Sequence, residues 1–558
     1  MKQPLKILSI IFFAGYLILI LATFKDYAIT QDEKYQKRYG ELVLNYYTSL
    51  FEDKSFLSYR NLYLYGGLVD GVSALLNKVS PFGEYETRHL WNALLGFFGV
   101  LAVYLLVYTL THSHGFSLLG VIFLFLSPRY YGHSFNNPKD IPFAAFYVFS
   151  LLAMVRTIPY WTSKRIPWKC LIALSFALGC TLGVRIGGVI LVFYLILFHS
   201  AWQALRWESQ EIQGREFFKS TLTFALFPMG LSLIWMIAFW PYVQSNTIEN
   251  VLNTLQMFKN FPFPYPMFFQ GDYILATEVP WDYVLTWYSI TTPLIQLLGL
   301  ALLLIGVALF SKSKLVGSLP PFDSKEGIWS IRLILFAMIF PVATAIISKS
   351  TLYDGLRHFL FLGPLTACLA ALGFYLFYQV IARFSFIKKG QRKLLNLIFY
   401  FVIIAGLYPV ASWQIRSHPN QYVYFNEVTG GLKGAFGKFD IDYYGNSERQ
   451  AALWLNDYVQ KQNYRFPIQV CSLTPPIMSG YYLDSNYFLK PLFVDYAFIG
   501  QFLNDLKLSL KKCHFYIANP RWGFLPKGET IHSIKVDDTP LIYIQINKIK
   551  MQQGIMEK

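Results

Sequence analysis

The sequence predicts a polytopic α-helical membrane protein with a small α/β domain at its C-terminal end. Of its 558 residues, 54% are apolar, 18% are aromatic and only 14% are charged, whereas about a quarter of the residues of a soluble domain are charged. Eleven apolar runs approach the ~20 residues that a helix needs to cross a hydrocarbon layer of ~30 Å. After Trp413 these runs stop, and polar turns separate shorter apolar segments. This composition excludes a disordered protein and argues against a soluble enzyme.

Lys2 and Lys6 lie at the start of the first candidate span, which therefore resembles a signal peptide. It lacks a small-residue cleavage site and is longer than a usual signal core, so we retain it as a span. The fifth and sixth spans form one apolar stretch, which we divide at residues 185–188 because a charge and two glycines are better tolerated in a turn than in lipid. The predicted spans are 5–24, 90–110, 116–131, 141–155, 168–184, 186–202, 221–240, 292–310, 331–347, 359–381 and 394–413.

The net charge of +16 is explained by the orientation of these spans rather than by a nucleic-acid partner. Lys and Arg are enriched in cytoplasmic loops. With the N-terminus inside, the basic segments 156–169, 206–219, 312–325 and 383–393 all fall on the cytoplasmic side. The sequence therefore predicts a cytoplasmic N-terminus and an extracytoplasmic C-terminus, and we expect the membrane to be a bacterial inner membrane.

Three segments are then expected outside: a first loop at 25–89, a loop at 242–288, and the residues after the last span. We predict a transmembrane domain at 1–415 and an extracytoplasmic α/β domain at 416–558. The loop at 242–288 is rich in proline and aromatic residues. It either covers an active-site cavity or forms an interfacial half-helix without a catalytic part.

In the C-terminal domain, Ser447 and Gln450 have the spacing of a capping box at a helix start. Residues 468–471 and 514–518 are typical of short buried strands, and residues 531–536 and 541–546 predict a terminal hairpin. Two cysteines of this domain, Cys471 and Cys513, would lie on an oxidising side of the membrane. They form either a disulfide bond or two buried thiols.

Two adjacent carboxylates, Asp32 and Glu33, follow the first span directly. A carboxylate beside a region of low dielectric tends toward a raised pKa, which suits a general base. The alternative is that any loop leaving a span needs polar residues.

The second outer loop, residues 128–142, contains cations and amides just before the chain returns to the membrane. A fixed cation at that depth can neutralise a phosphate headgroup where water cannot. The competing interpretation is interfacial snorkelling, although Asn, His and Asp do not snorkel. The candidates for phosphate binding are Arg129, His133 and Lys139, and those for substrate binding are Asn137 and Asp140.

Two further clusters flank the tenth and eleventh spans. Before the tenth, Arg357 is a second candidate phosphate ligand, or else an anchoring charge at a helix end. The other candidates for substrate binding in these clusters are Tyr353, Asp354, His358, Asn426 and Glu427. No phosphate-loop, GxSxG, HExxH or GxGxxG motif is present in the sequence.

Together these motifs resemble the GT-C class of phospholipid-carrier-dependent glycosyltransferases, which includes protein O-mannosyltransferases and aminoarabinose transferases. The resemblance rests on the Asp-Glu pair, on residues 137–140 and 353–358, and on His418-Pro419 followed by residues 424–427. It extends from the first span to about Gly445.

The resemblance implies an inverting transfer of a hexose or pentose from a polyprenyl-phosphate donor to a hydroxyl or amine on the outer face of the membrane. It implies Asp32 as general base and Glu33 as the second residue of the pair, while Lys139, Arg129 and Arg357 are assigned to the phosphate by motif context. The expected partners are the lipid-linked donor, membrane lipids, and an acceptor protein, glycolipid or polysaccharide. Some members of the wider class use a divalent metal, although the sequence has no compelling carboxylate cage for one.

Two rival functions use similar residues. A flippase of a lipid-linked sugar also needs cationic and aromatic groups near the outer leaflet, but an alternating-access transporter is expected to carry broken helices near the midplane, often in repeated halves. The polar residues here lie in outer loops, and the sequence shows no internal repeat. An O-antigen-type ligase or polymerase would differ from the proposed enzyme only in its acceptor.

Overall fold

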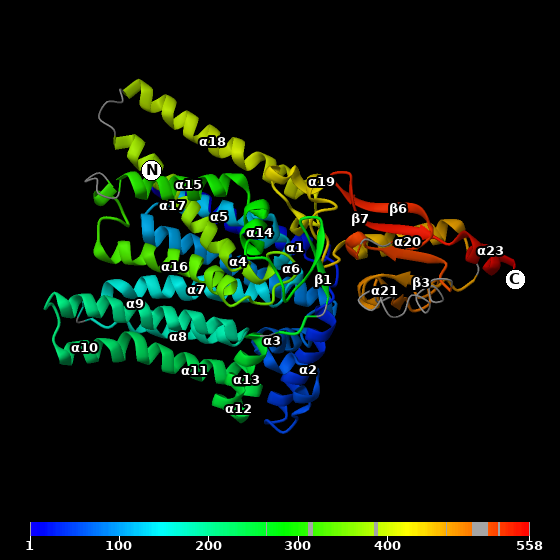
Figure 1. Cartoon of the computed structure of the whole chain (residues 1–558), viewed down its shortest axis with the longest axis horizontal. Helices are drawn as coiled ribbons and strands as arrows, with labels where there is room; N and C mark the ends of the chain where they lie inside the picture. The colour runs from blue at the N-terminus through cyan, green and yellow to red at the C-terminus, as the bar shows by residue number, and fades with distance from the viewer. Residues whose placement is uncertain are drawn as a thin grey trace.

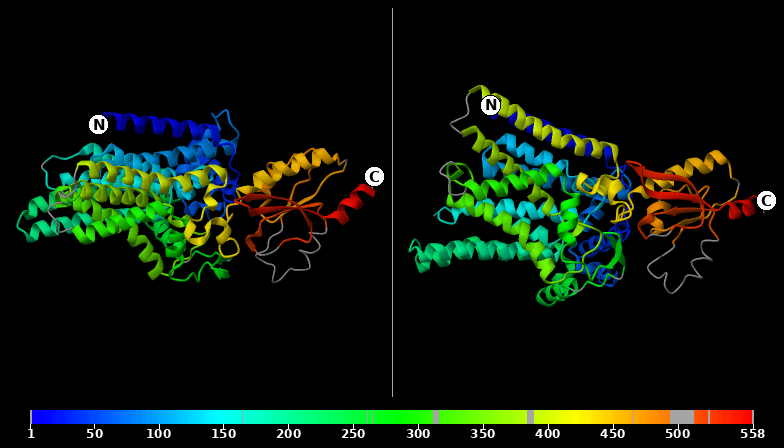
Figure 2. Two further views of the ribbon diagram at one scale, coloured as in Figure 1. Left: turned by 90° about the horizontal axis from the view of Figure 1, so that it is seen from above. Right: turned by 45° about the horizontal axis from the view of Figure 1, so that its top comes forward.

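The computed structural model shows a bundle of long helices with a small sheet extending from one end (Figure 1). It describes residues 2–163, 165–259, 261–263, 265–310, 316–383, 389–464, 466–493, 512–522 and 525–556. The chain enters the bundle at the end away from the sheet, and its C-terminus lies at the far tip of the sheet region (Figures 1 and 2). Entry and exit at opposite ends agree with an odd number of crossings.

A helix occupies each of the eleven predicted spans, so the prediction of a polytopic helical membrane protein is confirmed. Among the described residues, eight helices are long and apolar enough to cross a membrane, and α14 (Tyr283–Thr291) with α15 forms a ninth candidate, bent by 112°. The remaining two predicted spans fall on the shorter apolar helices α5 and α8. The helices are α1 (Lys2–Thr23), α4 (Glu84–Thr111), α5 (His114–Phe125), α7 (Asp140–Thr157), α8 (Trp168–Leu182), α9 (Val189–Glu208), α11 (Phe227–Phe239), α15 (Leu294–Phe310), α16 (Lys325–Ile347), α17 (Leu362–Arg383) and α18 (Lys389–Arg416).

Some predicted boundaries were wrong. The span predicted at 116–131 is two helices, because α5 ends at Phe125 and Pro128 begins the separate helix α6 (Pro128–Asn136), where a proline at the first position is well tolerated. The division at 185–188 is confirmed by the short 3-10 helix η4 (Ile186–Gly188) between α8 and α9. The span predicted from residue 221 begins earlier, since α10 (Gly214–Thr221) and the π-helical η5 (Leu222–Leu226) precede α11.

Both of the long loops predicted to lie outside contain secondary structure. The first holds α2 (Glu33–Thr48), η1 (Ser55–Ser58), η2 (Leu62–Leu64) and α3 (Leu68–Asn77). The second holds α12 (Pro241–Ser245), α13 (Thr247–Lys259) and an antiparallel hairpin of β1 (Pro266–Phe269) and β2 (Asp272–Leu275). The remaining short helices of the bundle region are η3 (Ile158–Tyr160), η6 (Val316–Ser318), η7 (Arg357–Phe359), η8 (Gln421–Val423), η9 (Glu427–Thr429) and α19 (Gly431–Ala435).

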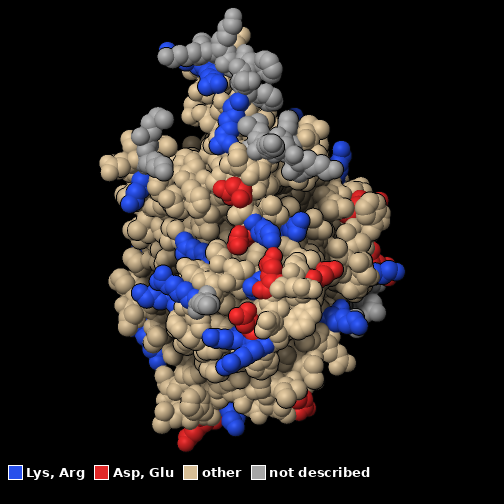
Figure 3. Space-filling view, turned by 90° about the vertical axis from the view of Figure 1, so that its left-hand side faces the viewer, with Lys and Arg blue, Asp and Glu red and all other residues tan. Residues whose placement is uncertain are grey.

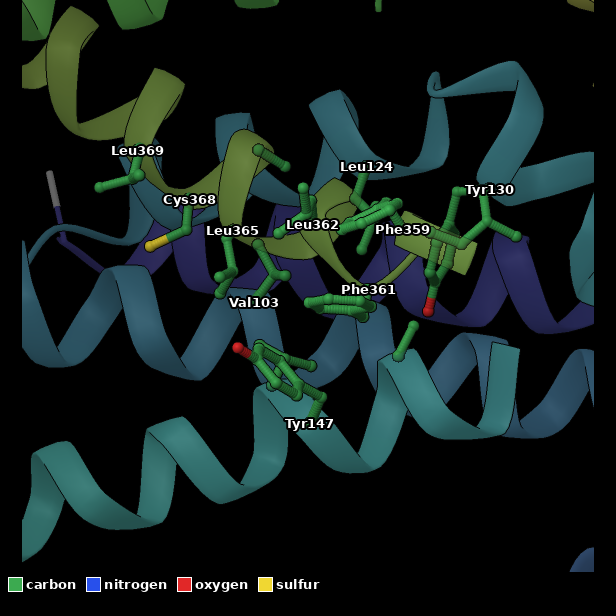
Figure 4. Packing of buried hydrophobic residues seen from close by; sticks show 14 of the residues in the cluster. Val103, Leu124, Tyr130, Tyr147, Phe359, Phe361, Leu362, Leu365, Cys368 and Leu369 are labelled. Carbon is green, nitrogen blue, oxygen red and sulfur yellow. The ribbon is translucent and has the colours of Figure 1, made fainter. Parts of the chain in front are cut away.

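The bundle packs around one large apolar core to which α4, α5, α7 and α17 contribute most of the fully buried side chains (Figure 4). Phe361 and Leu365 of the α17 region meet Tyr147 of α7 and Val103 of α4 in this core. Helices α15 and α17 approach closely, because a Cβ added at Gly373 would lie 1.9 Å from the carbonyl oxygen of Gly299. The tenth predicted span is therefore central to the bundle, and it fixes the loop immediately before it.

The described part of the C-terminal region contains a five-stranded mixed sheet with the order β4-β3-β5-β7-β6. The predicted hairpin is confirmed, since β6 and β7 pair antiparallel, whereas β3 pairs parallel with both β4 and β5. Ala451 and Leu455 of α20 pack with the sheet in a second apolar core. The elements are α20 (Ser447–Gln462), β3 (Val470–Ser472), α21 (Pro476–Gly480), β4 (Leu492–Phe493), β5 (Phe515–Ala518), η10 (Pro520–Trp522), β6 (Glu529–Val536), β7 (Thr539–Ile546) and α23 (Lys548–Met556).

The predicted capping box at the start of α20 does not form. Asn446 is the N-cap residue, and the Ser447 hydroxyl donates to the Asp442 carboxylate instead. Helix α20 is thereby tied to the segment that precedes it, which belongs to the larger apolar core through Tyr443 and Tyr444.

Of the two alternatives for the cysteines, the structure forms the disulfide between Cys471 and Cys513. The bridge joins β3 to the residues just before the neighbouring strand β5. The disulfide therefore links two neighbouring strands in the sheet covalently.

Basic side chains spread over the end of the bundle away from the sheet, among patches of acidic residues (Figure 3). The exposed residues of the predicted cytoplasmic loops include Arg156, Arg215, Lys219, Lys325 and Arg383.

Replacing Cys471 and Cys513 together by serine should lower the free energy of unfolding of the sheet region by about 2–4 kcal/mol, because the bridge restricts the unfolded chain between residues 42 apart. Thermal unfolding followed by circular dichroism measures this change, and mass shifts on alkylation without reductant test the bridge itself. Cys170→Ser removes a thiol that forms no disulfide and serves as the control. Two alkylated thiols at 471 and 513 in unreduced protein would contradict the bridge.

Candidate active site

A cavity of about 560 Å³ lies where the bundle meets the C-terminal region. Its wall combines charged groups with aromatic rings from both long outer loops. Three segments of the C-terminal region, 442–445, 473–478 and 519–521, close its other side. The lining residues are Gln31, Asp32, Tyr35, Arg60, Asn61, Leu62, Tyr65, Lys139, Phe261, Pro262, Phe263, Tyr265, Tyr353, Asp354, Arg357, Asp442, Tyr443, Tyr444, Gly445, Leu473, Thr474, Pro475, Pro476, Met478, Asn519 and Arg521.

Three predicted residues reach this cavity from the ends of different helices. Asp32 is the N-cap residue of α2, shortly after α1 ends. Lys139 precedes α7, and Arg357 begins the 3-10 turn η7 before α17. Because α7 and α17 pack in the same core, their preceding loops are held side by side at one end of the bundle.

Arg357 is the centre of the charged wall. Its guanidinium donates to three carboxylates: Nη2 to Asp32 at 3.0 Å, Nε to Asp140 at 3.2 Å and Nη1 to Asp354 at 2.9 Å. The planar fork of arginine suits such divided bonding. Only 6% of the Arg357 side chain is exposed, so the surrounding negative charge is what makes its burial tolerable.

Two further arginines extend this network. Arg185, from the turn between α8 and α9, lies 2.7 Å from Asp140. Arg521, from η10 of the C-terminal region, contacts Asp354 and also lies 3.2 Å from Asp440. Alternating charges therefore connect the bundle to the C-terminal region across the cavity.

The pKa of Asp32 is lowered, which corrects the expectation of a raised value. Burial alone raises the pKa, but the positive charges of Lys139 and Arg357 and the hydrogen bond from Arg357 lower it more. The raised pKa was expected from the low dielectric of a membrane boundary alone, whereas folding brings the cations Lys139 and Arg357 to Asp32.

Among the predicted cations that line the cavity, Lys139 has the fewest interactions with other charged groups in the described part of the chain. Its ammonium lies 4.4 Å from the centroid of the Tyr65 ring. The ion pairs formed within the described part of the chain do not include Lys139. Arg60, which the sequence argument did not select, also lines the cavity and is stacked over the Tyr35 ring.

Arg129 and His133, both predicted to bind phosphate, lie behind the cavity wall on α6. Both contact the hydroxyl of the lining residue Tyr443: Arg129 Nη1 at 3.4 Å and His133 Nε2 at 2.8 Å. The rings of Trp287 and Phe425 flank the Arg129 guanidinium at 5.2 and 5.0 Å. Neither predicted residue is part of the lining, so contact with a ligand would pass through Tyr443.

Glu33 points into the protein and away from the cavity. Its carboxylate accepts hydrogen bonds from the backbone N–H and the hydroxyl of Thr30, at 2.8 and 3.1 Å, and lies 3.0 Å from Nε2 of His89. These contacts anchor the turn that presents Asp32, although Glu33 stands next to Asp32 in the sequence.

Some of the remaining predicted residues line the cavity or support its wall, and two others lie away from it. Tyr353 and Asp354 line the cavity. Asn137 and Asp140 support Arg357 from behind, and His358 packs edge-on against Tyr353.

Asn426 and Glu427 do not line the cavity. Asn426 is buried against the end of α14, where it donates to the carbonyl oxygens of Ser289 and Thr292, and Glu427 is exposed.

Sequence reasoning missed Tyr443 and Arg521 as individual site residues. Tyr443 belongs to a segment, 440–445, that composition alone associates with sugar-binding surfaces and equally with interfacial belts. Arg521 has no local sequence signal, because only the sheet topology brings η10 to the cavity.

The aromatic segment of the second outer loop forms another wall. Phe263 stacks on Tyr353 with ring centroids 3.8 Å apart, and Phe261 and Tyr265 also line the cavity. This placement favours a covering role for the loop over a purely interfacial one. Within the described ranges, no group of three or more His, Cys, Asp or Glu side chains is arranged to hold a metal ion.

Residues 70–249 match the family model for dolichyl-phosphate-mannose-protein mannosyltransferase. The matched segment includes Arg129, His133, Lys139 and Asp140. The match confirms the resemblance to lipid-carrier-dependent glycosyltransferases over these residues. No curated protein sequence matches the chain.

Several solved structures align with most of the chain at low identity. The crystal structure of ArnT from Cupriavidus metallidurans bound to undecaprenyl phosphate aligns at 11% identity and a TM-score of 0.47, over 96% of this chain and 97% of ArnT. The archaeal oligosaccharyltransferase AglB from Archaeoglobus fulgidus, in complex with an inhibitory peptide and a dolichol-phosphate, aligns at 11% identity and a TM-score of 0.46, over 91% of this chain and 69% of AglB.

Replacing Arg357 by alanine should destabilise the fold by about 3–5 kcal/mol, because it leaves buried carboxylates without their shared partner. Thermal unfolding in detergent measures the loss. Arg383→Ala provides the control, since that exposed arginine lies at the far end of α17, where it donates to the Ser318 hydroxyl and to no carboxylate among the described residues. Equal unfolding temperatures for Arg357→Ala and the control would show that the network does not stabilise the protein.

Proposed function

We propose that the chain is an inverting glycosyltransferase that moves a sugar from a polyprenyl-phosphate-linked donor to an acceptor hydroxyl or amine on the outer face of the membrane. The observation that carries this proposal is the placement of Asp32 beside Lys139 and Arg357 in one cavity at the end of the bundle. The family match over residues 70–249 supports the same reaction class.

Asp32 is the proposed general base because it is the most accessible carboxylate of the charged network. Its side chain is 33% exposed, compared with 2% for Asp140 and 9% for Asp354. Both of these buried carboxylates are also held by a second arginine. Asp32 is therefore the carboxylate that can reach an acceptor at the least structural cost.

The lowered pKa makes Asp32 a weak base in the resting protein, and binding of the donor would correct this. A donor phosphate that accepts hydrogen bonds from Arg357 Nη2 competes with Asp32 for the same donor group. Weakening of the Asp32–Arg357 pair then raises the pKa of Asp32 toward its ordinary value. The base would become effective only when the donor is in place.

In the proposed step, the acceptor oxygen or nitrogen attacks the anomeric carbon while its proton passes to the Asp32 carboxylate. The bond from the anomeric carbon to the phosphate oxygen breaks, and its electron pair remains on the departing polyprenyl phosphate. Attack on the face opposite the leaving group inverts the anomeric configuration. A general base contributes about 10²–10⁴-fold, and charge stabilisation and positioning must supply the rest.

Lys139 is the proposed principal ligand of the phosphate. Arg357 is already shared among three carboxylates, whereas the Lys139 ammonium faces only an aromatic ring. An anion therefore gains more from Lys139, where no ion pair has to break. The aromatic wall around Phe263 and Tyr353 offers an apolar surface to the sugar ring or the first isoprene units.

The proposed topology places the cavity and the sheet outside the membrane and the basic loop end in the cytoplasm, in a bacterial inner membrane. The opposite placement of the two chain ends supports this arrangement (Figures 1 and 2). The proposal includes a boundary between the transmembrane and extracytoplasmic domains after residue 415. The proposed acceptor is a protein, glycolipid or polysaccharide, and the proposed sugar is a hexose or pentose. No step is assigned to a divalent metal.

A flippase for a lipid-linked sugar is the second candidate, and a ligase or polymerase with the same donor is the third. A flippase would use Lys139 and the aromatic wall but would form no new glycosidic bond. Covalent transfer by the purified protein distinguishes the first candidate from the second, and the identity of the product distinguishes it from the third.

Asp32→Asn should reduce sugar transfer from a polyprenyl-phosphate sugar to components of a membrane extract by about 10²–10⁴-fold, because the amide cannot accept the proton. Radiolabelled sugar in the product measures the rate. Glu52→Gln, at an exposed site in the same outer loop, is the matched control and should retain full transfer. Unchanged transfer by Asp32→Asn would refute the assigned base, and an inactive wild-type protein would favour the flippase.

Lys139→Ala should raise the KM for the lipid-linked donor by about 10–100-fold and leave the KM for the acceptor unchanged, because a charged hydrogen bond to the phosphate is lost. Steady-state kinetics with each substrate varied in turn separates the two values. Lys139→Arg should recover part of the loss, and Lys54→Ala, at an exposed lysine, should show none. An equal effect on both substrates would argue against a phosphate contact.

A further inference from the structure

The Tyr443 hydroxyl occupies an unusual position at the inner wall of the cavity. From behind, it is contacted by Arg129 Nη1 at 3.4 Å and by His133 Nε2 at 2.8 Å. Arginine donates every hydrogen bond that it makes. The direction of the His133 contact, which depends on the tautomer, therefore decides what Tyr443 can offer to a ligand.

The Asn137 side chain fixes that tautomer. Its Oδ1 accepts from the backbone N–H groups of Lys139 and Asp140, at 3.4 and 3.1 Å, and its Nδ2 donates to the Asp140 carboxylate at 2.8 Å. A carboxylate only accepts when it is ionised, so the amide nitrogen must face it. The same Nδ2 lies 3.3 Å from His133 Nδ1, which must then be an acceptor.

His133 is neutral, because burial lowers its pKa to about 3. A neutral imidazole with an accepting Nδ1 carries its hydrogen on Nε2. His133 therefore donates to Tyr443, as Arg129 does. Burial raises the pKa of Tyr443 to about 12, so the phenol keeps its own hydrogen at neutral pH.

Both accepting positions of the Tyr443 oxygen are thus filled from behind, and its hydrogen remains for the cavity. The described residues show no protein acceptor for this hydrogen. The backbone at this point is also fixed, since Arg521 donates to the Tyr443 carbonyl oxygen at 3.2 Å and Asn519 donates to that of Asp442 at 3.0 Å.

We infer that Tyr443 is a preset hydrogen-bond donor for an unprotonated phosphate oxygen of the polyprenyl-phosphate donor, an inference that rests on the proposed function. A sugar hydroxyl can both donate and accept, but the Tyr443 oxygen has no accepting position left. A phosphate oxygen only accepts, and the same cavity presents Lys139 and Arg357 to its charge.

Arg129 and His133 then have a different role from the phosphate binding predicted for them. Neither touches the ligand; both act through the hydroxyl of Tyr443, and Asn137 sets the direction of the chain of hydrogen bonds. They are positioning residues, which explains why two groups suited to anion binding lie behind the cavity wall.

The test compares the affinity of the purified full-length protein for undecaprenyl phosphate and for undecaprenol, which lacks the phosphate. Tyr443→Phe should weaken binding of the phosphate lipid by about 10–100-fold, the effect of losing a hydrogen bond to a charged group, and leave binding of the alcohol unchanged. Tyr424→Phe is the matched control, because it removes a buried hydroxyl that has no partner in the described part of the chain and does not line the cavity.

The outcomes separate the two proposals. Wild-type protein that binds both lipids equally would refute the phosphate donor itself and the Tyr443 contact with it. Phosphate-dependent binding that Tyr443→Phe retains in full would overturn only the Tyr443 assignment.

A second measurement keeps the inference testable if Tyr443→Phe does not fold. Incorporation of 3-fluorotyrosine at position 443 preserves the shape and makes the phenol more acidic. A more acidic phenol donates more strongly, so the phosphate lipid should bind more tightly at neutral pH. As the pH rises the phenol ionises, and binding should fall at a lower pH than in the wild type. Superimposable pH profiles for the two proteins would overturn the inference.

Discussion

The structure of the site depends on the burial of one guanidinium among carboxylates that come from three distant parts of the chain. Arg357 joins Asp32 after the first helix, Asp140 at the start of α7 and its own neighbour Asp354. A guanidinium of which only 6% is exposed is stable only with such partners. The loops at this end of the bundle are therefore held to one arrangement, and the cavity forms among them.

The same interaction restrains the chemistry. Against the effect of burial, the positive charges of Lys139 and Arg357 and the hydrogen bond from Arg357 stabilise the ionised form of Asp32 and make it a poor proton acceptor. In the proposed mechanism, a bound phosphate would compete for that arginine, which would couple donor binding to activation of Asp32 as the base. The inferred contact of Tyr443 with the phosphate would be of a different kind, because Asn137 sets the direction of the Tyr443 hydrogen bond through His133. The cations would then neutralise the phosphate, and Tyr443, from the same cavity wall, would supply a hydrogen bond of fixed direction.

Much of the fold follows from the sequence, because long apolar runs and alternating strands depend on local patterns. Each predicted span contains a helix, and the terminal hairpin forms as expected. Several residues of the candidate site could also be predicted from the sequence, since Asp32, Lys139 and Arg357 all line the cavity. Local patterns do not show in which direction a side chain points or which residues from distant parts of the chain come into contact. Glu33 points away from its neighbour Asp32, and Arg521 arrives from the C-terminal region.

The most direct test of the central claim is a structure of the protein in lipid nanodiscs with bound polyprenyl phosphate. We expect a phosphate within hydrogen-bond distance of Lys139 and Arg357, with the Asp32 carboxylate separated from Arg357 and open to the cavity. A phosphate bound at the opposite end of the bundle, or one bound in the cavity while the Asp32–Arg357 pair stays intact at its present 3.0 Å, would contradict it.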